Sequence, residues 1–419
     1  MANQRLLSKW YKVRGMAMIP RQPLMERVMK MKTILAVILL GVFVLLGCNT
    51  TDRKVTENDV HDSIQAELEK MFSKGRDLKN ALLLVHSDKH DFHWKFALGT
   101  TGDEQKPIGK NNPYHVASIG KTFTSMIIAR LYEGGEINYD DPISKYLSPE
   151  MLDGLFVYKG IDYSGEVLVR HLLNHTSGIA DYYEDKPMEG KSIKELIVEN
   201  PDRFWRPEET IEFTRNNQRA VSVPGKKFHY SDTGYNLLGK IIEEITRKPF
   251  HENLHTEIFD PLGMVSSYLL FYSKPKEKSP HTIPDTYLGE HEVSDFKSLS
   301  IDWAGGGIVS TTEDLLLFHR ALVNNTLIKK ETLELCKEDL GKFSFGMDYG
   351  YGILLLNIGK LTVFLPKDLN MWGNFGSIAA YMFYNPSHEV YIIGTFNHSD
   401  YVVKQVFFMI QVIREVNKL

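Results

Sequence analysis

The feature that most constrains the fold of this chain is the separation of its strand-like and helix-like segments. Apolar runs rich in β-branched and aromatic residues occur only near the two ends, at Ala81–His86, Phe92–Leu98, Gly352–Ile358, Ile378–Tyr384 and Val390–Phe396. Helical apolar periods fill the middle and flank both strand groups, as in Asp59–Phe72, Val167–Asn174, Tyr235–Arg247, Thr312–Leu322 and Val402–Val416. This order predicts an α+β protein in which both ends of the chain build one sheet around a helical insertion.

Ser118 and Lys121 are the leading candidates for chemistry. Residues three apart share a helical face, and the apolar residues after Ser118 keep a helical period until Gly134-Gly135. Ser118 then lies at a helix N-terminus, where free N–H groups favour developing negative charge. A desolvated Lys121 could accept the serine proton. The alternative is an N-cap serine beside a solvated lysine.

The segment ahead of this site is typical of an export signal. Thr33–Leu46 is an uncharged apolar stretch of 14 residues, preceded by basic residues, and it is shorter than the about 20 residues of a spanning helix. Leu45-Leu46-Gly47-Cys48 resembles a bacterial lipobox, which implies cleavage before Cys48 and a lipid on its thiol. An uncleaved anchor is the alternative, and Met29 or Met31 would make a conventional start.

The charge and cysteine content limit the partners. Beyond residue 47 the chain carries 41 basic and 52 acidic side chains, and nucleic-acid-binding proteins usually show a basic footprint. We therefore expect no nucleic-acid partner. Besides Cys48 the only cysteine is Cys336, so no internal disulfide is possible, and we expect Cys336 to be a small buried hydrophobe.

Further motifs follow Ser118 in a definite order. They are Leu172-Leu173-Asn174-His175-Thr176-Ser177-Gly178, Tyr230-Ser231-Asp232-Thr233-Gly234-Tyr235, Asp260-Pro261-Leu262-Gly263-Met264 and Gly305-Gly306-Gly307-Ile308-Val309-Ser310-Thr311. Together they resemble the serine β-lactamase and penicillin-binding protein superfamily, in its class C β-lactamase-related branch. The resemblance implies a β-lactamase-like fold, with an antiparallel sheet flanked by helices and an inserted all-helical region.

The export signal and the resemblance together predict a domain plan. Residues 1–47 would be a signal peptide, 48–57 a lipidated linker and 58–419 the serine hydrolase domain. The sheet would come from 58–117 and 300–419, with the helical insertion at about 118–299.

Site roles are carried over from the resemblance residue by residue. Ser118 would be the nucleophile that forms an acyl-enzyme, Lys121 its proton partner, and Tyr230 the group that moves the proton between serine and leaving group. The backbone N–H groups of Ser118 and Ser377 would form the oxyanion hole. Gly376 precedes Ser377 in the third motif and completes the expected substrate-binding strand.

Two positions depart from the family pattern. Asp232 stands where the second motif usually has asparagine, and Asn374 stands where the third motif usually has lysine or histidine. We expect both to face the substrate, Asn374 through an amide that can donate to a carbonyl. An anion near Lys121 favours the ammonium and makes it a poorer base. The pocket is then less suited to a substrate carboxylate, and neutral esters should react faster than penicillins.

Two rival interpretations are weaker. His175 and His115 could suggest a Ser–His pair, but the family pattern gives neither a catalytic role. His251-Glu252-Asn253-Leu254-His255 fits the H-E-x-x-H zinc pattern, but no third ligand follows at the extended spacing. We therefore expect no metal and no cofactor.

The sequence predicts a serine hydrolase acting through a Ser118 acyl-enzyme on a peptide, ester or related acyl substrate. It is expected outside the cytoplasm, held to a bacterial membrane by the lipid on Cys48. The alternative is a catalytically weak homologue that binds cell-wall peptide or β-lactam without turnover.

Overall fold

The computed structural model describes residues 54–75, 77–361 and 366–419. The expected signal segment and Cys48 lie outside these ranges. Within the ranges, no helix has the length and apolarity needed to cross a membrane.

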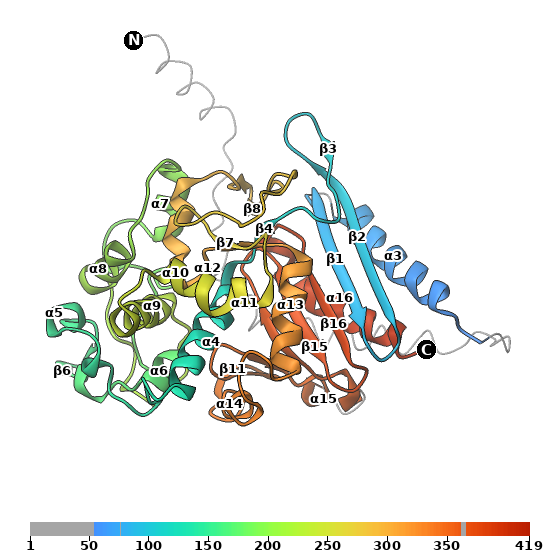
Figure 1. Ribbon diagram of the computed structural model, residues 1–419. Helices are drawn as coiled ribbons and strands as arrows, with labels where there is room; N and C mark the ends of the chain where they lie inside the picture. The colour runs from blue at the N-terminus through green and yellow to red at the C-terminus, as the bar shows by residue number, and fades with distance from the viewer. Residues whose placement is uncertain (1–53, 76, 362–365) are drawn as a thin grey trace, which may run out of the picture.

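The centre of the molecule is an antiparallel sheet built from both ends of the chain (Figure 1). Its nine strands run in the order β11-β12-β13-β14-β15-β16-β1-β2-β3. The first three in sequence are β1 (Asn80–Ser87), β2 (Phe92–Thr101) and β3 (Lys106–Pro107). The others are β11 (Gly341–Ser344), β12 (Met347–Tyr349), β13 (Leu354–Leu356), β14 (Met371–Phe375), β15 (Ala380–Asn385) and β16 (Val390–Thr395). Strands β1 and β16 pair with Leu82 opposite Thr395, which joins the two halves.

Helices cover both faces of this sheet. On one face lie α3 (Glu57–Lys74) and α16 (Val402–Val416), and on the other lies α13 (Thr312–Val323) (Figure 1). Successive residues of β1 therefore enter different cores: Leu82 and Leu84 pack toward α13, whereas Leu83 and Val85 pack toward α3 and α16. Burial on both faces explains why β1 is a continuous apolar run rather than an alternating one.

The insertion forms a mainly helical lobe beside the sheet (Figure 1). Its helices are α4 (Gly120–Glu133), α5 (Pro149–Leu152), α6 (Val169–Leu173), α7 (Ile193–Glu199), α8 (Pro207–Asn217), α9 (Asp232–Thr246), α10 (Phe250–Leu254), α11 (Asp260–Leu262) and α12 (Trp303–Gly306). Short β-pairs interrupt the helices, β5 (Val157–Tyr158) with β6 (Ile161–Asp162) and β8 (Tyr287–Leu288) with β9 (His291–Glu292).

A small second sheet joins the lobe to the main sheet. Strand β10 (Ile308–Ser310) pairs with β4 (Tyr114–His115) on one side and with β7 (Tyr268–Leu269) on the other. Since β4 leads directly into the Ser118 segment, this sheet fixes where that segment enters the lobe.

The predicted α+β arrangement with a flanked antiparallel sheet is confirmed. Val402–Val416 is α16 as predicted, and Thr312–Leu322 differs from α13 by one residue. Strands β11, β12 and β14 were not among the predicted elements, because they are short and contain Gly373 and other residues of low β-propensity. The remaining helices are α14 (Lys330–Leu335) and α15 (Ile358–Leu361).

Candidate active site

Ser118 lies at the start of the helix that carries Lys121. A single 3₁₀ turn, Ala117–Ile119, precedes α4, so the helical segment begins one residue before Ser118. Ala117 has a φ of 48°, in the left-handed region. Non-glycine residues adopt this region at a cost and mostly where the surroundings enforce it, which includes functional sites.

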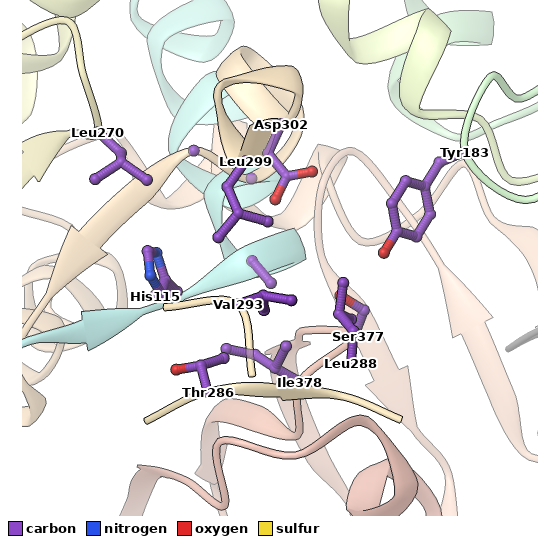
Figure 2. Close-up of a pocket in the computed structure, with 13 residues that line it drawn as sticks. His115, Tyr183, Leu270, Thr286, Leu288, Val293, Leu299, Asp302, Ser377 and Ile378 are labelled. Carbon is purple, nitrogen blue, oxygen red and sulfur yellow. The ribbon is translucent and has the colours of Figure 1, made fainter. Parts of the chain in front are cut away.

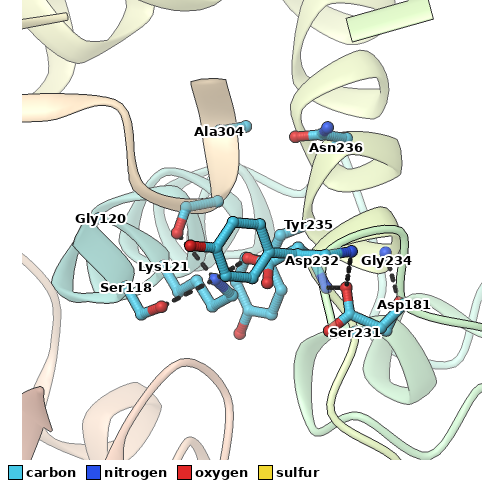
Figure 3. Close-up of polar contacts among 12 residues, drawn as sticks. Ser118, Gly120, Lys121, Asp181, Ser231, Asp232, Gly234, Tyr235, Asn236 and Ala304 are labelled. Carbon is cyan, nitrogen blue, oxygen red and sulfur yellow. Dashed lines mark hydrogen bonds and ion pairs between the residues drawn. The ribbon is translucent and has the colours of Figure 1, made fainter. Parts of the chain in front are cut away.

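Lys121 is the centre of the polar contacts around Ser118 (Figure 3). Its side chain is fully buried, and Nζ donates to Ser118 Oγ at 3.3 Å and to the Gly305 carbonyl at 2.8 Å. Nζ also forms an ion pair with the Asp232 carboxylate. The expected contact between Ser118 and Lys121 is therefore present. The carboxylate of Asp232, which stands where the family pattern has asparagine, also contacts Lys121 as expected.

Tyr230 and Asp232 reach this site from the start of α9. Ser231 between them is extended and caps α9, because its hydroxyl accepts from Gly234 N at 3.3 Å. In extended chain, residues two apart point to the same side. The Tyr230 ring accordingly lies 5.0 Å from Lys121 Nζ. Burial, followed by the charge of Asp232, raises the pKa of Tyr230 well above its usual value, so its hydroxyl is protonated at neutral pH.

A second carboxyl stands behind Asp232. Asp181 is fully buried, and it accepts hydrogen bonds from the backbone N–H of Asp232 and Tyr183, both at 3.1 Å. Burial, followed by the charge of Asp232, raises the pKa of Asp181 well above its usual value. Asp181 thus holds the position of the Asp232 backbone without adding a full charge.

Asn374 is held by contacts within the protein, and its expected role in substrate binding stays a prediction. It is buried on β14, and its amide nitrogen lies near four protein acceptors: Ser118 O (3.4 Å), Thr122 Oγ1 (3.2 Å), Tyr349 OH (3.4 Å) and Gly352 O (3.2 Å). Its carbonyl accepts from Phe375 N at 2.9 Å. Asn374 therefore anchors β14 to the first turn of the Ser118 helix.

Gly376 brings the end of β14 against the Ser118 segment. A Cβ at this position would lie 2.6 Å from Val116 O, 2.7 Å from Ala117 Cβ and 3.3 Å from Ser118 N. Real Cβ atoms do not approach backbone so closely, so only glycine fits here. The next residue, Ser377, lines the pocket described below, and its expected place beside the Ser118 amide stays a prediction.

The glycine residues 305–307 pack against the segment that carries Ser118. We expected Gly305-Gly306-Gly307 to be a tight turn, and it instead forms the end of α12 and the residue after it. A Cβ on Gly306 would lie 2.9 Å from the Ala117 carbonyl carbon. The sequence analysis missed that the Gly305 carbonyl accepts from Lys121, because no side chain marks a backbone acceptor.

A pocket lies beside the segment that carries Ser118, since Ala117 and Ser377 are among its lining residues (Figure 2). It encloses about 440 Å³ of empty space, part of it open to solvent, between the lobe and the end of the sheet. Its polar lining comes from His115, Tyr183, Thr286, Asp302 and Ser377, and none of its lining residues is lysine or arginine. Tyr183 and Asp302 were not among the predicted site residues, since neither belongs to a motif that the resemblance covers.

The histidines of the rival interpretations serve other contacts. His175 is buried, its Nδ1 accepts from Ser231 N at 3.1 Å, and its ring stacks on Tyr230 at 4.2 Å. It therefore orients the second motif. In the H-E-x-x-H segment, His255 Nε2 lies 3.2 Å from Ser273 Oγ. Within the described ranges, no three His, Cys, Asp or Glu side chains gather as metal ligands would.

Cys336 is fully buried, as expected, and burial raises the pKa of its thiol to about 12. At neutral pH the thiol is therefore protonated and unreactive.

Comparisons with known proteins agree with this geometry. The family described as Beta-lactamase matches residues 78–406. Penicillin-binding protein 4* of Bacillus subtilis is 27% identical over 300 residues, which are 64% of this chain and 61% of that protein. Teichoic acid D-alanine hydrolase of Staphylococcus aureus is 29% identical over 175 residues, 41% of this chain and 36% of that protein. The chain thus matches less than two thirds of the length of these relatives.

A solved structure extends the likeness to most of the fold. The D-stereospecific amidohydrolase from a Streptomyces species superposes with a TM-score of 0.68 and 26% identity, over 83% of this chain and 97% of that one.

Proposed function

The protein belongs to the β-lactamase family, and we propose that it is a serine hydrolase that cleaves amide or ester bonds through an acyl-enzyme on Ser118. The observation that carries the proposal is the position of Lys121 Nζ, which lies 3.3 Å from Ser118 Oγ and 5.0 Å from the centre of the Tyr230 ring. As Ser118 Oγ attacks the acyl carbon, its proton would pass to Lys121 Nζ in the neutral amine form. That proton would then pass through the Tyr230 hydroxyl to the leaving group as the bond between the acyl carbon and the leaving group breaks.

The transition state would gain from the position of Ser118. Attack creates a negative oxygen on the acyl carbon, and the start of a helix presents free N–H groups to such a charge. The close approach of Gly376 places the end of β14 within reach of the same oxygen. The names of the compared proteins, a D-alanine hydrolase and an amidohydrolase, support small acyl substrates.

Lys121 favours a second candidate function. It forms an ion pair with Asp232 and donates to the Gly305 carbonyl, so Nζ is engaged by two partners besides Ser118. A lysine held in this way would support turnover poorly, and the protein would then bind cell-wall peptide or β-lactam at Ser118 without sustained turnover. Product formed beyond one equivalent therefore decides between the two functions.

The decisive experiment is labelling with a fluorophosphonate, followed by intact-mass analysis. We expect one adduct on the wild type and none on a folded Ser118→Ala variant. Turnover of a chromogenic neutral ester should continue well beyond one equivalent. A labelled Ser118→Ala protein would refute the nucleophile, whereas a burst of one equivalent without further product would favour the binding function.

We also propose that the protein is a lipoprotein outside the cytoplasm. This rests on the sequence of residues 33–48, which lie outside the described ranges. The Cys48→Ser variant should lose both lipid labelling and membrane retention. Unchanged membrane retention of that variant would favour an uncleaved anchor instead.

A further inference from the structure

The pocket beside Ser118 contains an unpaired carboxylate. Asp302 ends the 3₁₀ segment Lys297–Asp302 and lines the pocket together with Tyr183 and Ser377 (Figure 2). Among the described residues, none donates a hydrogen bond to Asp302 or forms an ion pair with it; its electrostatic neighbours act only through space. An ionised carboxylate in a partly buried pocket costs free energy unless a hydrogen-bond donor or a cation pairs with it.

The neighbouring charges do not supply a partner. Lys121 influences Asp302 from α4 but is already paired with Asp232, which repels Asp302 from α9. His115, from β4, donates through Nε2 to the Ser294 carbonyl at 3.1 Å, and burial lowers its pKa, so its ring is neutral at pH 7. The Tyr183 hydroxyl is also uncharged at pH 7, since burial raises its pKa well above the usual value.

One cation lies near the pocket wall but points elsewhere. Lys194 Nζ is 4.7 Å from the centre of the Tyr183 ring and pairs with Glu184 at 2.6 Å. It is not among the residues that line the pocket. The lining therefore contains a carboxyl group and no lysine or arginine to pair with it.

We propose that Asp302 binds a protonated amine of the substrate, so that the site selects acyl donors with a free amino group, such as aminoacyl esters and amides. The inference rests on the proposed hydrolase function and names its substrate class. An ammonium has three N–H donors and no acceptor. Asp302 can take one of them in a charge-assisted hydrogen bond, and the hydroxyls of Tyr183 and Ser377 line the same space.

The proposal predicts a particular pH dependence. Burial, followed by the charge of Asp232, raises the pKa of Asp302 to about 7, while Lys121 opposes this shift. An ammonium binds the ionised carboxylate in preference to the acid. The preference for an amine-bearing substrate should therefore rise between pH 5.5 and 7.5, until the substrate amine begins to lose its own proton.

The test compares D-alanine methyl ester with N-acetyl-D-alanine methyl ester by the ratio of their kcat/KM values. The wild type should favour the free amine, and Asp302→Asn should lower the ratio by about 10- to 100-fold, as expected for one charge-assisted hydrogen bond. Asp302→Glu should recover part of the loss. Asp295→Asn is the matched control, because Asp295 is exposed seven residues earlier and does not line the pocket; its ratio should equal that of the wild type.

The outcomes separate this inference from the proposed function. If the N-acetyl ester is hydrolysed but the ratio is the same in wild type and Asp302→Asn, the amine site is wrong and the hydrolase stands. If the wild type prefers the N-acetyl ester, the amine site is also wrong. If neither ester is hydrolysed and Ser118 takes no fluorophosphonate, both proposals fail. The pH dependence of the wild-type ratio tests the amine site even if Asp302→Asn does not fold.

Discussion

The ammonium of Lys121 and the carboxylate of Asp232 form an ion pair directly behind the Ser118 hydroxyl. The lysine is fully buried, whereas 13% of the Asp232 side chain is exposed. The pair therefore links the group beside the serine hydroxyl to a carboxylate at the edge of the site. Asp232 is one of the two positions at which the sequence departs from the family pattern it resembles.

We predict that Asp232→Asn raises the rate of neutral-ester acylation of Ser118 by about tenfold or more, because Lys121 Nζ loses its anionic partner and is left to contact the Ser118 hydroxyl. Stopped-flow measurement of neutral-ester acylation at neutral pH would show the change. Asp141→Asn is the control, because it removes the carboxylate of an ion pair with the more exposed Lys145 (2.9 Å). An unchanged acylation rate in Asp232→Asn would contradict this role of the pair.

The hydroxyl of Tyr230 is predicted to matter for proton transfer rather than for folding. Tyr230→Phe should slow turnover by about 10²- to 10⁴-fold, the usual range for general acid–base catalysis. The ring stacking on His175 at 4.2 Å is kept, so the melting temperature should change little. Tyr351→Phe removes a hydroxyl that donates to Asp339 at 3.0 Å and lines no part of the pocket; its turnover should match the wild type. A Tyr230→Phe enzyme of full activity would exclude the proton-transfer role.

Close packing at Gly376 should make this position intolerant of any side chain. Gly376→Ala places a Cβ within 2.7 Å of Ala117 Cβ, so either Ser118 or the end of β14 must move. We expect slower labelling of Ser118 and destabilisation of about 1–3 kcal/mol. Gly165→Ala is a matched control, since no heavy atom lies within 4 Å of its added Cβ. Equal stability and labelling of the two variants would rule out the packing constraint.

The stability of the protein should depend on pH through Asp302. Its pKa is raised from 3.8 to about 7 on folding, so the folded state binds more protons than the unfolded state between these values. The favourable contribution is fully present below about pH 4 and is lost as pH rises through about 7. Asp302→Asn removes the cost of ionisation, and its melting temperature should exceed that of the wild type more at pH 8 than at pH 5. The opposite trend in calorimetry would show that Asp302 is already paired.

Sequence patterns predicted the elements whose signals are local. Val402–Val416 has a clear helical period, and Ser118 with Lys121 needs only one turn of helix to meet. The side on which Asn374 points could not be predicted, because β14 is buried throughout and gives no alternation to follow. Asp302 was missed for another reason: the whole helical insertion separates it from Ser118 in sequence, and only folding brings it to a pocket that Ala117, the neighbour of Ser118, also lines.

The pairing of β1 with β16 has a consequence for how the protein can be made. Leu82 and Thr395 lie opposite each other although nearly the whole domain separates them in sequence, so the contact order of the central sheet is high. Such sheets fold slowly, because a long loop must close, at a cost in chain entropy, before the strands gain any free energy from pairing. The first strand of the sheet has no neighbour on its inner side until the last strand has been synthesised. The emerging chain must therefore keep one edge of this apolar strand unpaired through most of its synthesis, while β2 pairs with the other edge.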